Sequence, residues 1–278
     1  EIIGGPVMSS HLMRLVSWMS GHYFAKEGAV LKNIFPPEFW KLKNTGPDVK
    51  PLNEETGVVI SSVFPMSDVI RQNALKKIYK AYLLHAPDTG YELSFLLETV
   101  SGLKNAIVLC PDRLRMEQAY KSLREQAGDR AVLYYSGLKV SEKKKALARI
   151  IGGESDIVVG GRFAVFAPLR EVSLVAVMRE ESTTYKEEAG IRYNARDMAV
   201  MRGYLEGASV LLSSVCPSVE SYHNAVAGKY WPIETPRPFR PRVRVIDMRK
   251  TRAPISYKLR SAVETVMKKG GRAVFVVN

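Results

Sequence analysis

The chain has 278 residues, and its shares of 46% hydrophobic and 25% charged residues are typical of a folded globular protein. It has no apolar run of about 18 residues and no basic-then-apolar leader, so we expect neither a membrane span nor a secretion signal. Lysine and arginine outnumber aspartate and glutamate by 41 to 28, and the net charge of +13 indicates either a solvated basic surface or a polyanionic partner, most commonly nucleic acid.

The N-terminal residues 8–35 carry apolar side chains at helical spacing, with Ser9 or Ser10 as the candidate N-cap. Trp18 and Tyr23 share the apolar face, so core packing is favoured over base stacking for both. The polar stretch at 41–57, which contains several prolines and glycines, is typical of a linker.

Six short apolar runs predict buried strands, and they lie at residues 83–85, 106–110, 132–135, 157–159, 174–178 and 210–212. Each run is too short for a helix and is rich in β-branched residues or leucine, which is typical of strands covered on both faces. Helical patterns lie at 68–79, 116–127, 141–151 and 195–205. This alternation predicts an α/β fold with one mostly parallel sheet, whose ligand crevice lies at the carboxyl ends of the strands.

The loop at residues 86–94 follows the first of these strands, where a phosphate-binding loop would stand. Such a loop needs glycines that expose N–H groups, a lysine for the outer phosphates and a hydroxyl for magnesium. This loop has one glycine and no lysine, and its candidate positions are Asp88, Thr89, Gly90 and Glu92. Asp88 and Glu92 place negative charge where a triphosphate would sit, which argues against nucleotide binding.

The cysteines, Cys110 and Cys216, lie far apart in the sequence and favour reduced thiols in a cytoplasmic protein over a disulfide. The chain has no Cys-x-x-Cys pair, so we predict no metal site.

The C-terminal part changes character at residues 231–252, which are rich in proline and arginine. Residues 256–269 predict a helix, and 272–278 predict a strand. Because the chain begins at Glu1 and stops within that apparent strand, we expect either a fragment or a truncated gene product.

Six segments between residues 155 and 221 carry motifs: VGGRFA at 159–164, FAP at 166–168, MREE at 178–181, TTYK at 183–186, YNARDMAVMR at 193–202 and SSVCPS at 213–218. These segments resemble lobe 1 of the primosomal replication-restart DNA helicases (PriA), a superfamily 2 family, in their order, their spacing and their non-catalytic residues. The resemblance implies a RecA-like, P-loop NTPase-type parallel sheet with flanking helices.

The same resemblance implies three regions. Residues 1–57 would be a remnant of the N-terminal DNA-binding, winged-helix region with a linker, 58–230 helicase lobe 1, and 231–278 a basic connector and the truncated start of a second RecA-like lobe. The family uses ATP and magnesium, and it carries its zinc cysteines in a later segment that this chain lacks.

The catalytic positions are where the chain departs from the family. The family has GVTGSGKTE over residues 86–94, and its DEEH box falls on Met178, Arg179, Glu180 and Glu181. Magnesium-dependent hydrolysis needs the first two acids of that box. Their loss together with the loop lysine predicts a degenerate site with no ATP cofactor. The alternative is a shift of the box by one or two residues along the chain, which would bring Glu180 or Glu181 to the metal.

The DNA-binding candidates implied by the family are Arg162, Tyr185, Lys186, Arg240, Arg242 and Arg244. We expect Tyr185 to be exposed for base stacking and Tyr193 to pack in the core. Ser214, Pro217 and Ser218 retain part of the box that couples nucleotide state to the rest of the lobe.

The sequence therefore favours a helicase-like protein that binds single-stranded or forked DNA in replication restart, with replication-restart proteins as further partners. Whether it is an enzyme stays open at this point. One alternative is an active ATP-dependent DNA helicase, and another is a non-catalytic scaffold that binds a replication protein.

Overall fold

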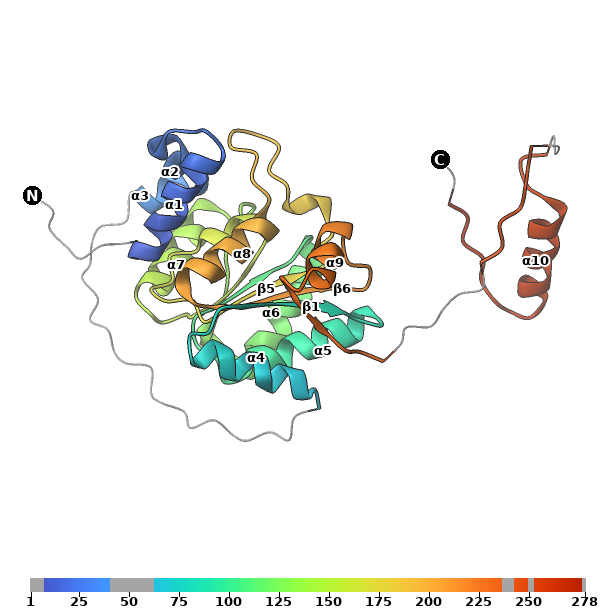
Figure 1. Ribbon diagram of the computed structural model, residues 1–278, viewed down its shortest axis with the longest axis horizontal. Helices are drawn as coiled ribbons and strands as arrows, with labels where there is room; N and C mark the ends of the chain where they lie inside the picture. Colours follow the sequence, from blue (N-terminus) through green and yellow to red (C-terminus); the bar gives the residue numbers. More distant parts are fainter. Residues whose placement is uncertain (1–7, 41–62, 237–242, 250–252, 277–278) are drawn as a thin grey trace, which may run out of the picture. The chain divides into compact units, whose positions relative to one another are not determined.

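The structure is a computed structural model that describes residues 8–40, 63–236, 243–249 and 253–276 (Figure 1). The chain divides into two compact units, Glu1–Pro238 and Phe239–Asn278. Across the described ranges, every helix is too short or too polar to cross a membrane.

The first unit is built on a parallel sheet of seven strands in the order β3-β4-β2-β5-β6-β1-β7. The strands are β1 Lys80–His85, β2 Ala106–Leu109, β3 Ala131–Leu133, β4 Ile157–Gly160, β5 Leu174–Met178, β6 Ser209–Ser214 and β7 Trp231–Ile233. Every pairing is parallel. The six predicted strands are thus confirmed in one sheet, and β7 adds a short edge strand that was not predicted.

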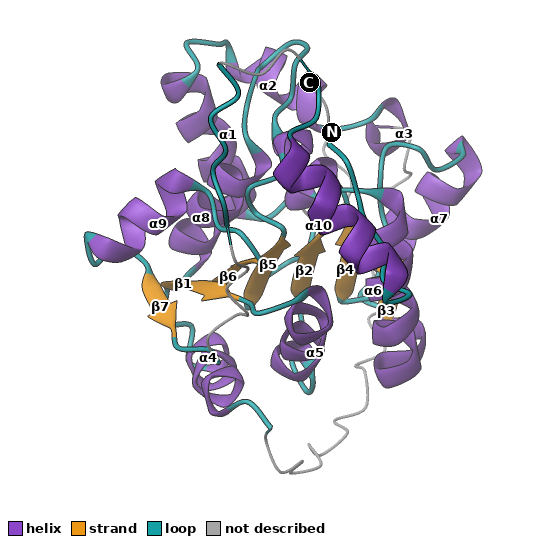
Figure 2. Cartoon of the chain, turned by 90° about the vertical axis from the view of Figure 1, so that its right-hand side faces the viewer, coloured by secondary structure: helices purple, strands orange, loops and turns teal. Residues whose placement is uncertain are grey.

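Two helical layers cover the sheet, as Figure 2 shows. The helices of the first unit are α1 Ser10–His22, α2 Glu27–Ile34, α3 Pro37–Trp40, α4 Pro65–Leu75, α5 Thr89–Val100, α6 Arg113–Ala127, α7 Val140–Ile151, α8 Ala195–Glu206 and α9 Val219–Val226. One core lies between the sheet and α4, α5 and α6, and the other between the sheet and α1, α7 and α8. Along β5, Val175 and Val177 face the second core while Leu174 and Ala176 face the first, so the whole run must be apolar.

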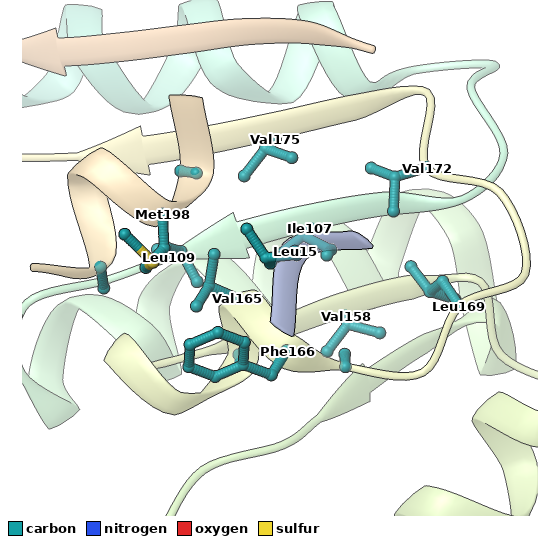
Figure 3. Close-up of a cluster of buried hydrophobic side chains, with 14 of the residues drawn as sticks. Leu15, Ile107, Leu109, Val158, Val165, Phe166, Leu169, Val172, Val175 and Met198 are labelled. Atoms are coloured by element: carbon teal, nitrogen blue, oxygen red, sulfur yellow. The ribbon is translucent and has the colours of Figure 1, made fainter. Parts of the chain in front are cut away.

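The N-terminal helices join the second core. Ser9 caps α1 by accepting a hydrogen bond from the Leu12 N–H, as expected for one of the two candidate caps. The buried face of α1 includes Leu15, which packs among sheet and α8 residues (Figure 3). Trp18 and Tyr23 are half-buried against the same core, which agrees with the core packing that their spacing predicted.

A fully buried ion pair holds α8 to the segment that follows β4. The Nε of Arg202 lies 2.7 Å from Oε1 of Glu206, and its Nη1 donates to the carbonyl oxygens of Val165 and Ala167. The other oxygen of Glu206 accepts from the Val172 N–H at 2.8 Å. The pair therefore supplies hydrogen-bond partners to backbone N–H and C=O groups that the surrounding apolar core cannot satisfy.

The second unit contains α10 Tyr257–Lys268. The strand predicted at 272–278 is not formed over 272–276, where the backbone has no regular structure. A strand needs a neighbour for its backbone N–H and C=O groups, and none pairs with this segment among the described residues.

We expect Arg202→Met to lower the free energy of unfolding by about 3–5 kcal/mol, because it leaves Glu206 buried without a cation. Urea denaturation followed by circular dichroism measures the change. The matched control is Arg113→Met, which breaks an exposed arginine–glutamate pair at the same helical spacing and should barely move the midpoint. Equal losses in the two variants would show that burial of the pair contributes nothing.

Candidate functional site at the carboxyl edge of the sheet

The parallel register brings three predicted groups of residues together. His85 of β1 lies level with Ser214 of β6, and Met178 of β5 lies level with Ser213. The loop after β1, the box after β5 and the turn after β6 therefore meet at one edge of the sheet. This is the edge at which open α/β sheets bind their ligands.

The loop after β1 is organised by its own acid. The Asp88 carboxylate accepts a hydrogen bond from the Tyr91 N–H at 2.8 Å and so caps α5, which begins at Thr89 and continues through Gly90. Asp88 thus satisfies an N–H group that would otherwise be available to an anion at the helix N-terminus.

Glu92 lies one turn into α5, and its residue surface is only 1% exposed. Its Oε1 accepts from the Arg179 N–H at 2.9 Å and from the Ser213 hydroxyl at 2.7 Å. Burial raises the pKa of Glu92 above the ordinary range, while the hydrogen bonds from Arg179 and Ser213 oppose the rise. The carboxylate joins α5, the end of β5 and β6.

Arg179 follows β5 in a left-handed backbone conformation, with φ 50°, which is uncommon for a residue other than glycine. Its N–H points to Glu92, and its Nε lies 2.7 Å from Oε1 of Glu181. Oε2 of Glu181 is buried and has no hydrogen-bond partner in the described structure.

Glu180 is the second buried acid of this edge. It accepts hydrogen bonds from Arg196 Nη1 at 3.2 Å, from Ser218 N and Oγ at 2.6 and 2.9 Å, and from Ser221 Oγ at 2.8 Å. These donors lie on α8 and at the start of α9. Of the predicted coupling residues, Ser218 contacts Glu180 directly.

The turn around the other coupling residues is held locally. The hydroxyl of Ser214 accepts from the Cys216 N–H at 2.8 Å, and Pro217 lies in the same turn before α9. The sequence predicted that Arg196 pairs locally with Asp197, and the two lie 3.0 Å apart, but it gave no separate role to Ser213 or Ser221. Ser213 follows the apolar run 210–212 directly, which was its signal, whereas Ser221 stands among polar residues and had none.

Met178 gives this edge an apolar contact. It is buried, and its sulfur lies 3.9 Å from Sγ of Cys110. Burial raises the pKa of the Cys110 thiol, so this thiol stays protonated at neutral pH.

The expectation that Tyr185 is exposed for base stacking is wrong. Tyr185 is 1% exposed, and its hydroxyl donates to the Met178 carbonyl oxygen at 2.6 Å. The single helical turn Thr183–Tyr185 directs the ring inward beneath the end of β5. Burial raises the pKa of this phenol well above the ordinary range. Tyr193 is buried as predicted.

Arg162 and Lys186 brace the loop that precedes α8. Arg162 Nε lies 3.0 Å from Oε2 of Glu187, and its Nη1 donates to the Thr184 carbonyl oxygen. Lys186 Nζ donates to the Arg192 carbonyl oxygen at 2.8 Å. Both cations keep solvent-exposed surface. Their contact with DNA stays a prediction.

Of the three connector arginines, Arg244 is exposed within the second unit. Arg240 and Arg242 lie outside the described residues.

The all-parallel sheet, with its polar turns gathered at the carboxyl edge, defines a RecA-like α/β lobe. No family model matches the chain. The chain is 25% identical over 247 residues to the "Replication restart protein PriA" of Rickettsia conorii, a match that covers 87% of this chain and 38% of the relative. It is 29% identical over 244 residues to the PriA of Helicobacter pylori strain 26695, covering 82% of this chain and 38% of that relative.

A solved DEAD box protein from the hyperthermophile Methanococcus jannaschii aligns with a TM-score of 0.40 and 17% identity, covering 59% of this chain and 47% of that one. The sequence relationship carries the identification: the chain is a distant homologue of the PriA replication restart proteins across most of its length. It spans about two fifths of the length of these two relatives, at 38% of each.

We expect stability to fall as pH rises from the ordinary glutamate pKa to the raised pKa of folded Glu92. Across that window the unfolded chain has lost this proton while the folded protein keeps it, so the folded state binds more protons. Glu92→Gln keeps an acceptor for Arg179 and Ser213 and removes this dependence. The difference in urea midpoint, variant minus wild type, should therefore increase as the pH rises above the ordinary glutamate pKa.

Glu187→Gln is the control of opposite sign. Burial works against ionisation of Glu187, but N–H groups of its own loop and Arg162 outweigh it and leave the pKa lowered. The ionised form is favoured in the folded state, so this variant should lose stability at neutral pH and little in acid. Parallel pH profiles for wild type and Glu92→Gln would contradict the assignment.

Proposed function

We propose that this chain is a helicase-like lobe that holds single-stranded or forked DNA in replication restart and does not hydrolyse ATP. The homology to PriA supports the replication setting, and the net charge of +13 supports a polyanionic partner. The cytoplasmic location expected from the cysteines belongs to the same proposal.

One observation carries the proposed loss of hydrolysis: the buried Glu92 carboxylate with its two donors. Matched letter by letter with the family's loop, Glu92 stands where the lysine that neutralises phosphate stands. Met178, which contacts Cys110, stands where the magnesium-binding aspartate stands. These residues do not fit a magnesium-bound triphosphate, because Glu92 supplies no positive charge for the phosphates and the side chain of Met178 offers no oxygen to the metal.

The competing function, a working ATP-dependent helicase, requires a displaced acid. Glu180 is already committed to donors on α8 and α9. One oxygen of Glu181 pairs with Arg179, and the other has no partner in the described structure. Glu181 is therefore the acid on which that alternative depends.

ATP with magnesium should bind with a Kd of about 1 mM or weaker, since the buried Glu92 side chain stands at the phosphate position and brings no positive charge to it. Isothermal calorimetry measures this binding, and a sensitive phosphate-release assay with single-stranded DNA measures hydrolysis. Micromolar ATP binding, or hydrolysis that Glu181→Gln abolishes, would establish the working helicase instead.

DNA binding should weaken steeply with salt, should not depend on added ATP and should read no particular sequence. Replacing Arg240, Arg242 and Arg244 together by alanine should flatten the plot of log affinity against log salt by about two to three units, if each meets a phosphate. Fluorescence anisotropy with a labelled oligothymidylate measures the slope.

The matched control removes the same charge elsewhere, by alanine at Lys143, Lys144 and Lys145 of α7. Equal flattening by both triples would mean that the connector has no special role. If the wild type binds no DNA at low salt and micromolar protein, the non-catalytic scaffold replaces the proposed function.

A further inference from the structure

The turn between α1 and α2 exposes an aromatic side chain in a backbone conformation that suits glycine. Phe24 has φ 51° and is 97% exposed. The Ala25 N–H donates to the Ser20 carbonyl oxygen at 3.0 Å, which is the closing bond of the helix C-terminal motif whose left-handed position usually holds glycine. A bulky residue is a backbone outlier there, so the fold itself gains nothing from Phe24.

Two more rings lie just before this turn on α1. The rings of Trp18 and His22 stack with centroids 4.5 Å apart and planes 13° apart, and Tyr23 meets both edge-on. Trp18 and Tyr23 are anchored on the core, while His22 is exposed. We call the two exposed rings, His22 and Phe24, the aromatic turn surface.

The charges around the aromatic turn surface are mainly positive. Arg14, one turn before Trp18, and Lys26, at the start of α2, are both exposed and form no ion pair among the described residues. Two acids lie nearby. The Glu27 carboxylate accepts a hydrogen bond from the Ser17 hydroxyl at 2.5 Å, and Asp197, whose charge acts on Tyr23, pairs with Arg196.

The loop that precedes α8 packs against α2. Gly190 of that loop lies so close to the side chain of Asn33 on α2 that a Cβ would collide with it. Figure 1 shows α1 and α2 beside this loop, which carries the exposed cations Lys186 and Arg192. The loop that carries Lys186 and Arg192, together with the exposed acid Glu188, therefore packs against α2.

We infer that the aromatic turn surface stacks the bases of single-stranded nucleic acid, with Arg14 and Lys26 meeting its phosphates. Exposed rings beside unpaired cations suit single strands, since every base has a π-face and every linkage an anion. The unpaired charge favours this partner over an apolar protein surface. The inference rests on the proposed DNA binding and names where the bases lie.

The test compares Phe24→Gly with the wild type. Glycine relieves the left-handed strain, so the thermal midpoint should rise, while affinity for oligothymidylate should fall about five-fold or more through the lost stacking. Phe24→Ala removes the ring but keeps a Cβ in the strained backbone, and it should lose the same affinity without the gain in stability. Tyr222→Ala, which removes an exposed ring from α9, is the control and should bind as the wild type does.

An abasic oligonucleotide of the same length separates stacking from charge, because it keeps the phosphates and lacks the bases. The wild type should prefer oligothymidylate to the abasic strand, and Phe24→Gly should lose that preference. If the wild type binds DNA and Phe24→Gly binds it equally well, the stacking assignment is overturned and the surface suits a protein partner. If the wild type binds neither oligonucleotide, the proposed function fails with it.

Discussion

Two carboxylates, those of Glu92 and Glu180, are buried where the carboxyl ends of β1, β5 and β6 meet, and the structure around them follows from the need to satisfy them. A buried carboxyl group without hydrogen-bond partners is strongly unfavourable. Glu92 accepts from the residue after β5 and from β6, and Glu180 accepts from α8 and the start of α9. Each acid therefore fixes elements that are distant in the sequence, and the edge behaves as one hydrogen-bonded unit.

The strands could be predicted because their cause is local. A strand covered on both faces must be apolar at every position, and the run Leu174–Met178 meets that condition without reference to any other part of the chain. The edge strand β7 has a proline and two exposed residues among its three, so no such pattern marks it. The segment 272–276 of the strand expected at 272–278 has a sequence typical of a strand, but it forms none. Backbone pairing needs a second segment, and the sequence of one segment does not supply it.

At the candidate site, the sequence predicted which loops meet but not what their side chains do. Parallel register alone brings the loop after β1 to the residues after β5 and β6. The burial of Tyr185 depends on one carbonyl oxygen at the end of β5, and the pairing of Arg162 depends on Glu187, 25 positions away. Such partners depend on which residues the fold brings together. The sequence around an arginine or tyrosine in a polar loop therefore does not distinguish contact with DNA from contact with the protein.

The placement of Glu92 bears on how nucleotide and DNA are linked. A ligand shifts a conformational equilibrium only through a difference in its affinity for the two states. In a nucleotide-driven lobe, the contacts between the phosphate loop and the ends of the neighbouring strands form and break with the bound phosphate. Here the carboxylate that joins α5, β5 and β6 is part of the chain and never dissociates. Under the proposed function, the DNA-binding surface therefore stays in one state, and its affinity is set by charge, salt and stacking rather than by a hydrolytic cycle.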